Sequence, residues 1–241
     1  LMYLPVEPRD ESLKNISRIF EEIAQKIEAN IKFSKVHRLY QRNDDELTKL
    51  QVERKGVRIK IEASPVTRGT VREPLLMQNT SKVQDMFGFV STSIVHLDDL
   101  YAGKMCAALD RQHPRDFFDI RGLIDNEGIS DDLINVFIVY LISSSQPISK
   151  LLDPNLIDIS KTYEEQFIGM TVKPIELSVL EETRKELISI VNEKLTDSHK
   201  EFLIGFKKGQ PNWELLPFKN VRELPSVQWK QINLDCMDEL G

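Results

Sequence analysis

The sequence has few of the residues that build disulfide-held or metal-held scaffolds. Its 241 residues include two cysteines, Cys106 and Cys236, and four histidines. Two isolated cysteines exclude a disulfide framework and a cysteine zinc site, and the histidines do not have the spacing of zinc ligands. Stability must therefore come from apolar packing. The 41% of apolar residues are enough for one substantial core or two modest ones.

Long apolar runs and an excess of positive charge are also missing. No run approaches the roughly 20 apolar residues of a membrane span, and no signal peptide is visible. We therefore expect a cytoplasmic protein with no membrane partner. The net charge of -6 argues against nonspecific coating of nucleic acid, although it is compatible with a local basic cleft.

Polar chemistry is densest in residues 98–124, which read DDLYAGKMCAALDRQHPRDFFDIRGLI. Helical periodicity predicts a helix over residues 99–112, with Asp98 or Asp99 as its N-cap. The proline that follows lacks a backbone donor but suits a first helical turn, so a second helix is predicted over residues 114–125. Each helix then has one face that can pack and another that can meet a polar ligand.

Charged side chains in this segment indicate a phosphate site. They are Lys104, Arg111, Arg115, Asp116 and Asp119. Cations neutralise phosphate oxygens, and carboxylates hold Mg²⁺ or position an attacking group. The simpler interpretation is a set of surface ion pairs, each contributing about 0 to 1 kcal/mol. Gly103 weakens that interpretation: glycine costs about 1 kcal/mol inside a helix, so a glycine beside a lysine suggests that another group approaches closely.

The segment LYAGKMCAALDRQHPRDFFDI resembles the C-terminal signature of the AbiEii-type nucleotidyltransferase toxin family. That signature has a lysine, then an A-L-x-R segment, then an R-D-x-x-D segment. The resemblance extends through RIKIEASPVTRGTV upstream and through GMT and LPSVQWKQINL downstream, so it covers essentially the whole chain. It implies an α+β fold, in which a nucleotidyltransferase-like mixed sheet with helices occupies residues 1–97. A helical C-terminal region would follow in residues 98–241.

The resemblance also implies an activity. The protein would transfer a nucleotidyl group from a nucleoside triphosphate, with Mg²⁺, to an acceptor. In known relatives the acceptor can be the 3′ end of tRNA, and the activity serves as the toxin of a toxin–antitoxin or phage-defence (abortive infection) pair. The implied partners are thus an NTP, a tRNA and a cognate antitoxin. Two alternatives stay open: a non-catalytic remnant that binds nucleotide, RNA or antitoxin, and a nucleotidyltransferase that acts on a small molecule.

The resemblance assigns roles within residues 98–124. Lys104 would bind the triphosphate and neutralise charge that develops on the leaving pyrophosphate. Asp119 is the first choice as a catalytic or metal-positioning carboxylate, and Asp116 is the second. Arg111 and Arg115 would hold phosphates or orient those carboxylates.

Two further candidates lie upstream. A strand predicted over residues 57–63 places Arg58, Lys60 and Glu62 on one face. Nucleotidyltransferase folds often add a third carboxylate from a neighbouring strand, and Glu62 is the residue that resembles it as a metal ligand. An ordinary solvent-facing glutamate accounts for Glu62 equally well. Arg68, in the loop that follows, would reach a phosphate or simply be solvated.

Two parts of the family pattern are not in this sequence. They are the Asp-x-Asp pair that binds the catalytic metals and the glycine-rich turn ahead of it. In the family both precede a segment like LMYLPV, with which this sequence opens, and that segment reads as the tail of a strand. We expect a member that is truncated at its N-terminus; a degenerate, inactive relative is the alternative.

Periodicity also predicts the elements around the site. Strands are expected over residues 36–41, 48–54, 57–63 and 70–77, and helices over residues 12–30, 133–142, 163–170, 177–195 and 199–206. Residues 83–90 read as a short apolar connection. Residues 209–225 read as a loop-rich tail, which Trp213 and Trp229 are expected to pack onto the helices. His113 stands between the two central helices, where it is expected to make a structural hydrogen bond at the corner; contact with a ligand is the alternative.

Overall fold

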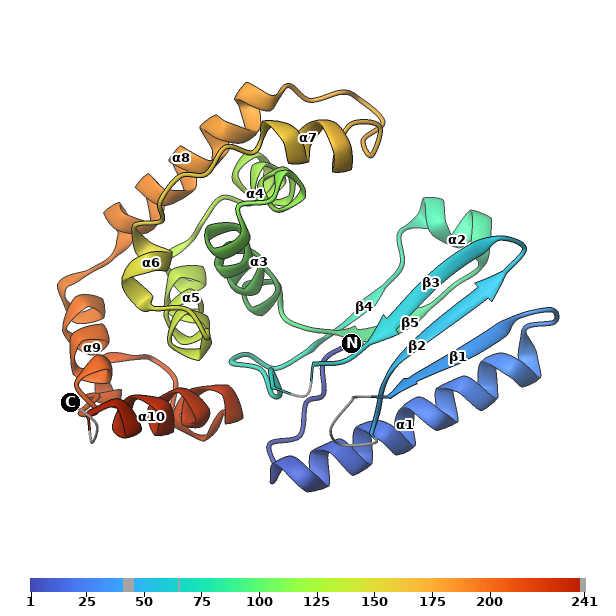
Figure 1. The fold of residues 1–241 in the computed structure, drawn as a ribbon, viewed down its shortest axis with the longest axis horizontal. Coiled ribbons are helices and arrows are strands. Elements are labelled where there is room, and N and C mark those ends of the chain that lie inside the picture. The colour runs from blue at the N-terminus through green and yellow to red at the C-terminus, as the bar shows by residue number, and fades with distance from the viewer. Residues whose placement is uncertain (41–45, 65, 239–241) are drawn as a thin grey trace. The chain divides into compact units, whose positions relative to one another are not determined.

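A computed structural model of the chain describes residues 1–40, 46–64 and 66–238 (Figure 1); of residues 235–238 only the backbone is described. The chain divides into two compact units. Residues 1–69 with residues 223–226 form the first, and residues 70–222 with residues 227–241 form the second. The division into residues 1–97 and 98–241 stays a prediction.

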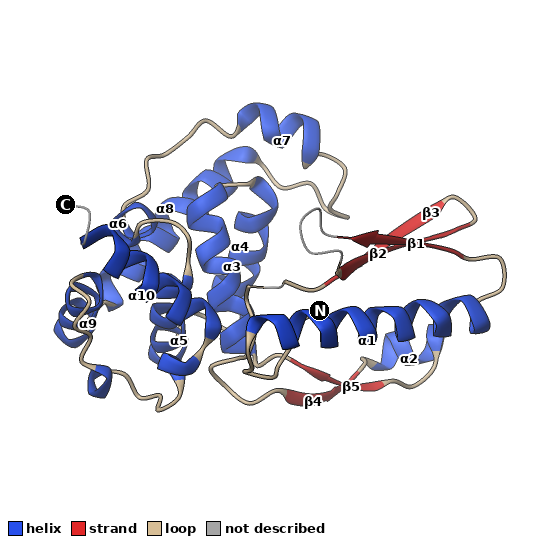
Figure 2. Cartoon of the chain, turned by 60° about the horizontal axis from the view of Figure 1, so that its bottom comes forward, coloured by secondary structure: helices blue, strands red, loops and turns tan. Residues whose placement is uncertain are grey.

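The first unit is a long helix that lies along an antiparallel sheet (Figures 1 and 2). The sheet has the strand order β1 (Lys35–Tyr40), β2 (Leu47–Arg54), β3 (Val57–Glu62). Helix α1 (Arg9–Asn30) buries one stripe at helical spacing against it. The core between helix and sheet contains Ile16, Phe20, Ala24, Leu47, Leu50 and Ala63. The predicted helix and three strands are thus confirmed; the expected strand end at residue 41 lies outside the described residues.

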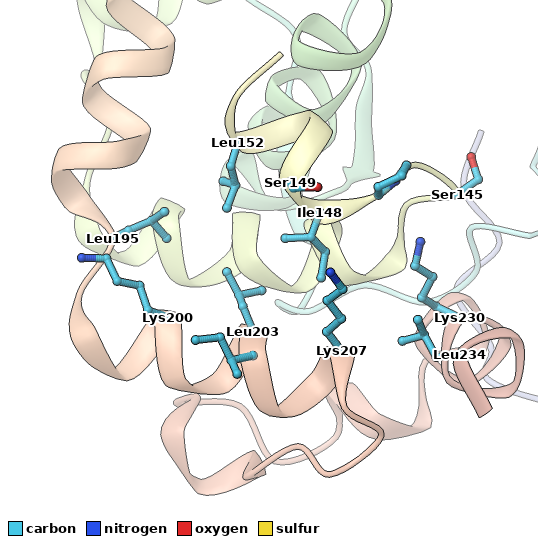
Figure 3. Close-up of a pocket in the computed structure, with 12 residues that line it drawn as sticks. Ser145, Ile148, Ser149, Leu152, Leu195, Lys200, Leu203, Lys207, Lys230 and Leu234 are labelled. Atoms are coloured by element: carbon cyan, nitrogen blue, oxygen red, sulfur yellow. The ribbon is translucent and has the colours of Figure 1, made fainter. Parts of the chain in front are cut away.

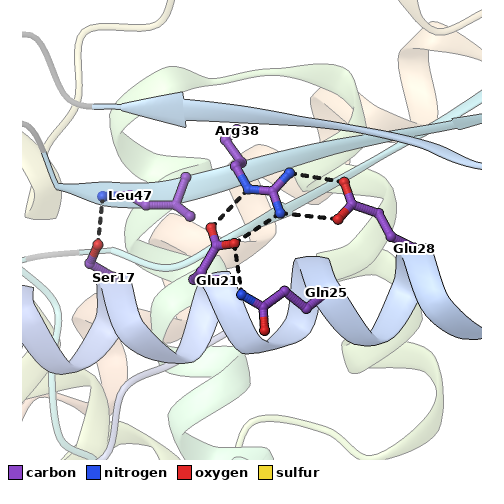
Figure 4. Close-up of polar contacts among 6 residues, drawn as sticks. All are labelled: Ser17, Glu21, Gln25, Glu28, Arg38 and Leu47. Atoms are coloured by element: carbon purple, nitrogen blue, oxygen red, sulfur yellow. Dashed lines mark hydrogen bonds and ion pairs between the residues drawn. The ribbon is translucent and has the colours of Figure 1, made fainter.

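A polar network fastens β1 to α1 (Figure 4). The Arg38 guanidinium donates to both carboxylate oxygens of Glu21, at 2.8 and 2.9 Å, and to those of Glu28, at 2.9 and 3.1 Å. These bonds lower the pKa of both carboxyl groups below the usual value. The Ser17 hydroxyl accepts the N–H of Leu47 at 3.2 Å, where β2 begins. The helix and the sheet are therefore joined by polar contacts as well as by the core.

The second unit begins with a small β-hairpin-like arm. Strands β4 (Leu75–Gln78) and β5 (Ser91–Ile94) pair antiparallel, with helix α2 (Ser81–Phe87) between them in sequence. The predicted strand over residues 70–77 is therefore too long. The N–H groups of Val71 and Arg72 donate to the Asp99 carboxylate, at 2.8 and 3.0 Å, instead of to a neighbouring strand.

The predicted apolar connection over residues 83–90 is wrong over most of its length, because Val83, Met86 and Phe87 lie on α2. Their i, i+3, i+4 spacing is helical. All three side chains are exposed, so no burial reinforces the pattern.

Helices make up the rest of the second unit. They are α3 (Leu97–Arg111), α4 (Pro114–Asn126), α5 (Asp131–Ser143), α6 (Ile148–Leu152), α7 (Ser160–Gln166), α8 (Leu177–Lys194), α9 (Asp197–Lys207) and α10 (Pro225–Asp238). Helix α3 packs on α4 and α5, and α4 packs on α8 (Figure 1). Met105, Phe117 and Phe137 have no exposed surface and belong to this core. The buried helix predicted over residues 133–142 is confirmed.

The α+β fold class is confirmed. The described strands pair antiparallel, and the parallel pairing among the described residues is an isolated bridge between Tyr3 and Arg68. In the tail, the Trp213 ring packs edge-on against Phe202, with ring centroids 5.5 Å apart, as expected. Trp229 instead lies on α10, with 47% of its surface exposed. No helix in the described part of the chain is long and apolar enough to cross a membrane.

Candidate functional site at the α3–α4 corner

Helix α3 starts two residues before its predicted start. Its N-cap is His96, whose Nδ1 accepts the N–H of Asp98 at 3.1 Å, so the prediction of Asp98 or Asp99 as N-cap is wrong. Asp99 is buried in the first helical turn, where it accepts the Tyr140 hydroxyl at 3.0 Å in addition to the two backbone groups of the preceding loop. The Asp99 carboxylate therefore connects this loop, α3 and α5.

The corner between α3 and α4 forms as the sequence predicts. Helix α3 ends at Arg111, and Gln112 turns the chain in the left-handed conformation, with φ of 49°. Pro114 is the first residue of α4. His113 caps α4, because its Nδ1 accepts the N–H of Arg115 at 3.2 Å. The structural hydrogen bond expected of His113 is thus confirmed.

A buried polar cluster that the sequence did not reveal holds the corner in place. The Gln112 amide donates to the Asn155 carbonyl at 2.8 Å and accepts from Arg184 of α8 at 3.0 Å. Arg184, only 5% exposed, also donates to the Ile157 carbonyl at 2.7 Å. Its guanidinium lies 5.9 Å from the centre of the Phe117 ring. The sequence alone gives no signal for the hydrogen bond between Arg184 and Gln112, because these residues are 72 positions apart.

Two ion pairs bridge α3 and α4. Lys104 Nζ lies 2.5 Å from Asp119 Oδ2, and the two side chains are 34% and 42% exposed. Arg111 Nη2 lies 2.7 Å from Asp116 Oδ1. The structure therefore brings together four of the five charged residues predicted for this segment. Arg115 is exposed and has no carboxylate partner among the described residues.

A cavity of about 410 Å³ lies beside the Lys104–Asp119 pair. Its wall also carries Arg121 and the aromatic rings of Tyr101 and Phe118. Lys104 and Arg121 can contact phosphates and the two rings can contact a planar group, whereas the carboxylates of Asp125 and Glu127, which also line the cavity, oppose a high negative charge. The ammonium group of Lys104, whose side chain is 34% exposed, is thus positioned to meet such a ligand.

Arg121 is a site residue that the sequence analysis missed. It pairs with Asp125 on its own helix and, at 2.9 Å, with Glu186 of α8. These partners raise its pKa above the usual value, with the Asp125 hydrogen bond as the largest cause. The i, i+4 spacing of Arg121 and Asp125 was a usable signal, whereas Tyr101 and Phe118 read as ordinary helix residues.

Gly103 is approached by a neighbouring helix. A Cβ atom at this position would lie 3.4 Å from the ring of Tyr140 on α5, which is an ordinary van der Waals distance. The group that approaches Gly103 is therefore the Tyr140 ring, at a distance that would also allow an alanine.

Glu62 and Arg68 belong to the first unit. Glu62 is half exposed, and its carboxylate lies 3.5 Å from Lys49 Nζ and 3.8 Å from Lys60 Nζ. Arg68 is 6% exposed and donates to the Glu7 carbonyl at 3.2 Å and to the Ser12 hydroxyl. Burial lowers the pKa of Arg68. The roles predicted for both residues stay predictions.

The residues described here do not by themselves fit the Mg²⁺ that the resemblance implies. Among the side chains that the structure describes, those of residues 1–40, 46–64 and 66–234, no three or more from His, Cys, Asp or Glu cluster so as to hold a metal ion. The neighbours of Glu62 are lysines, and the carboxylates of Asp116 and Asp119 contact cations. No step of the transfer is therefore assigned to a metal ion held by these residues.

Comparison with known proteins gives one match. A family model described as nucleotidyl transferase AbiEii toxin, type IV TA system, matches residues 1–235. No curated protein and no solved structure matches the chain.

Proposed function

The chain belongs to the AbiEii family of nucleotidyl transferase toxins of type IV toxin–antitoxin systems, and we propose that it transfers a nucleotidyl group from an NTP to the 3′ end of a tRNA. The observation that best supports a nucleotide site is the Lys104–Asp119 pair beside a cavity with two aromatic rings. A cognate antitoxin is a further partner in this proposal.

Lys104 is the proposed triphosphate ligand. An ammonium group has three N–H donors, and the contact with Asp119 Oδ2 occupies one of them. The other donors can bind phosphate oxygens and stabilise the charge that develops on pyrophosphate as it leaves. Arg111 and Arg115 are exposed at the same corner and would add longer-range attraction for phosphate.

Asp119 is the proposed catalytic carboxylate. In the transfer, an acceptor hydroxyl oxygen bonds to the α-phosphorus and the bond to pyrophosphate breaks, while the hydroxyl proton passes to a carboxylate. Asp119 suits this role because its side chain is 42% exposed beside the cavity. Asp116 is the second choice: its side chain is 15% exposed, and its Oδ2 is buried without a hydrogen-bond partner among the described residues.

The rings of Tyr101 and Phe118 are proposed to contact the nucleobase. Phe118 is 41% exposed, and one of its neighbours is the Phe167 ring, with centroids 5.9 Å apart. Stacking on an aromatic ring tolerates any base, so this contact would support binding without choosing the nucleotide.

Mg²⁺ belongs to the proposal as the partner of the triphosphate, whose oxygens it would neutralise. Glu62, in the first unit, stays a candidate metal ligand on the sequence resemblance alone, because the charged groups beside its carboxylate are the lysines Lys49 and Lys60. Arg68 remains a proposed phosphate contact.

Label transfer from NTP to tRNA tests the proposal. The protein is incubated with labelled NTPs, Mg²⁺ and total tRNA, and label at the tRNA 3′ end is quantified. We expect Lys104→Ala and Asp119→Asn each to lower the rate by about 100-fold or more, as for the loss of a group that stabilises the transition state. Lys185→Ala, which changes an exposed lysine on α8, is the matched control and should leave the rate unchanged.

Three outcomes would count against this reading. Equal rates for Lys104→Ala and the control would remove Lys104 from the site. NTP binding without any transfer would favour the non-catalytic alternative. Transfer of label to a small hydroxyl compound, with none to tRNA, would favour the small-molecule alternative.

A further inference from the structure

We propose that a second cavity in the helical unit binds a small amphiphilic anion, with an apolar body and a carboxylate or phosphate head. The cavity measures about 660 Å³ and is formed by α6 with the segment before it, by α9 and by α10 (Figure 3). This volume lies within the usual range of small-molecule sites, about 300 to 1,000 Å³. None of its lining residues belongs to the cavity at the α3–α4 corner, and the proposal does not rest on nucleotidyl transfer.

The walls of this cavity are mainly aliphatic. Ile148 and Leu152 come from α6, Leu203 from α9 and Leu234 from α10, and Leu195 lies between α8 and α9. In Figure 3, Leu152 extends from above and Leu203 from below into the same space. Water cannot hydrogen-bond to aliphatic walls, so the free energy of binding is favourable when an apolar group of a ligand replaces it. The described lining residues include no aromatic ring on which a nucleobase would stack, so they do not suit a nucleotide.

The positive charge at this cavity comes from lysines, of which Lys200 is already paired with Asp197 at 3.7 Å. Lys200, Lys207 and Lys230 all line it, and none of its described lining side chains is a carboxylate. Lys207 and Lys230 extend toward the Ile148 end, whereas the Lys200 ammonium lies near Leu195 (Figure 3). Charge complementarity therefore selects an anionic ligand over a neutral one.

Two of these lysines have no ion-pair partner among the side chains that the structure describes, which do not include those of residues 235–238. Lys207 has no ion-pair partner among the described residues, and Lys230 donates to the Gln146 carbonyl at 2.9 Å. Burial lowers the pKa of Lys230. An ammonium group that is partly removed from water, with no carboxylate beside it, is unfavourable. A ligand carboxylate or phosphate would relieve this cost while its apolar body fills the aliphatic space.

Calorimetric titration with three ligands that share one apolar chain tests the proposal. The ligands are decanoate, decyl phosphate and the neutral decanol. We expect at least one of the two anions to bind at least about tenfold more tightly than decanol, because a hydrogen bond to a charged group contributes more than a neutral one. The comparison of decanoate with decyl phosphate tells a carboxylate source from a phosphate source.

Three variants locate the binding. The double variant Lys207→Gln, Lys230→Gln should weaken the anions about tenfold and leave decanol unchanged. Ile204→Trp, at an exposed position in the lining, should weaken all three ligands by filling the cavity. Lys208→Gln changes the exposed lysine next to Lys207, which is outside the lining, and should match the wild type. Circular dichroism checks that each variant is folded.

Equal affinity for decanol and both anions would overturn the proposal, as would no binding or an unchanged affinity in the double variant. An amphipathic Glu/Leu peptide is titrated in parallel. Tighter binding of that peptide than of either anion would replace the small anion with an acidic protein segment.

Discussion

At the scale of the residue, the hydrogen bonds of His199 make the stability of the folded protein depend on pH. Its backbone N–H donates to the Thr196 hydroxyl at 3.2 Å, so Thr196 caps α9. Its ring Nδ1 accepts the N–H of Thr196 at 3.3 Å, and its Nε2 lies 3.0 Å from Asn135 Oδ1. The neutral ring with hydrogen on Nε2 satisfies both contacts. Protonation of Nδ1 would break the contact with Thr196.

We expect the free energy of unfolding to fall as the pH drops through about 6.5, the usual pKa of histidine in an unfolded chain. Burial lowers the pKa of His199 in the folded protein, and Asp131 only partly opposes this. The unfolded chain therefore binds the proton first, and the stabilisation present above pH 6.5 is lost below it. Urea unfolding at pH 7.5 and 5.5 measures the effect for the wild type and His199→Gln.

His199→Gln serves as the control, because a glutamine side chain does not change its charge with pH. The advantage of the wild type over His199→Gln should shrink between pH 7.5 and 5.5. An advantage that grows toward low pH would show that the folded protein prefers the charged ring.

At the scale of the element, α3, α4 and α9 each contain a glycine in their interior. Helix propensity alone predicts the same cost of glycine at all three positions. A Cβ atom on Gly122 of α4 would meet no atom within 4 Å. On Gly205 of α9 it would lie 2.9 Å from the Gln210 carbonyl oxygen, which is backbone and cannot easily move. Gly103 of α3 is intermediate. The effect of an alanine at each position therefore depends on the atoms that are packed around that helix.

We predict opposite effects for two glycine substitutions. Gly122→Ala should raise the free energy of unfolding by about 1 kcal/mol, because alanine is the better helix former. Gly205→Ala should lower it by about 1 to 3 kcal/mol, because the new methyl group overlaps the Gln210 carbonyl in the segment after α9. Urea unfolding of both variants, without nucleotide, measures the difference. Changes of the same sign would contradict the geometry.

Elements with strong periodicity were predicted well, and elements decided by distant partners were not. Helices α1, α3 and α8 each bury one mainly apolar stripe, and α5 is a continuous apolar run that is buried on nearly all sides. Both patterns can be read from the sequence. The strand expected over residues 70–77 fails for a different reason, since its first N–H groups bond to Asp99 on α3. Nothing within those residues encodes that partner.

At the scale of the whole molecule, each of the two units has its own core. Phe20 is 2% exposed in the first unit, and Phe137 is fully buried in the second. Each truncation to alanine should cost about 3 to 5 kcal/mol. Because the packing lost lies within one unit, we expect faster amide hydrogen exchange mainly in the mutated unit.

Hydrogen exchange read by mass spectrometry checks this prediction. For Phe20→Ala the increase should lie in residues 9–62, and for Phe137→Ala in residues 97–206. Exchange that rises equally in both ranges for both variants would show that the chain opens as one cooperative body.

The sequence by itself determined the α+β class and the two central helices with their proline corner. It also placed Lys104 and Asp119 on those helices, within the segment that resembles the AbiEii family. These features depend on periodicity and motifs that lie along a short length of chain. Only the tertiary structure decided that Lys104 pairs with Asp119, that Arg184 holds Gln112, and that three lysines surround an aliphatic cavity. Such contacts join residues that are far apart in sequence, and they form only when the helices pack.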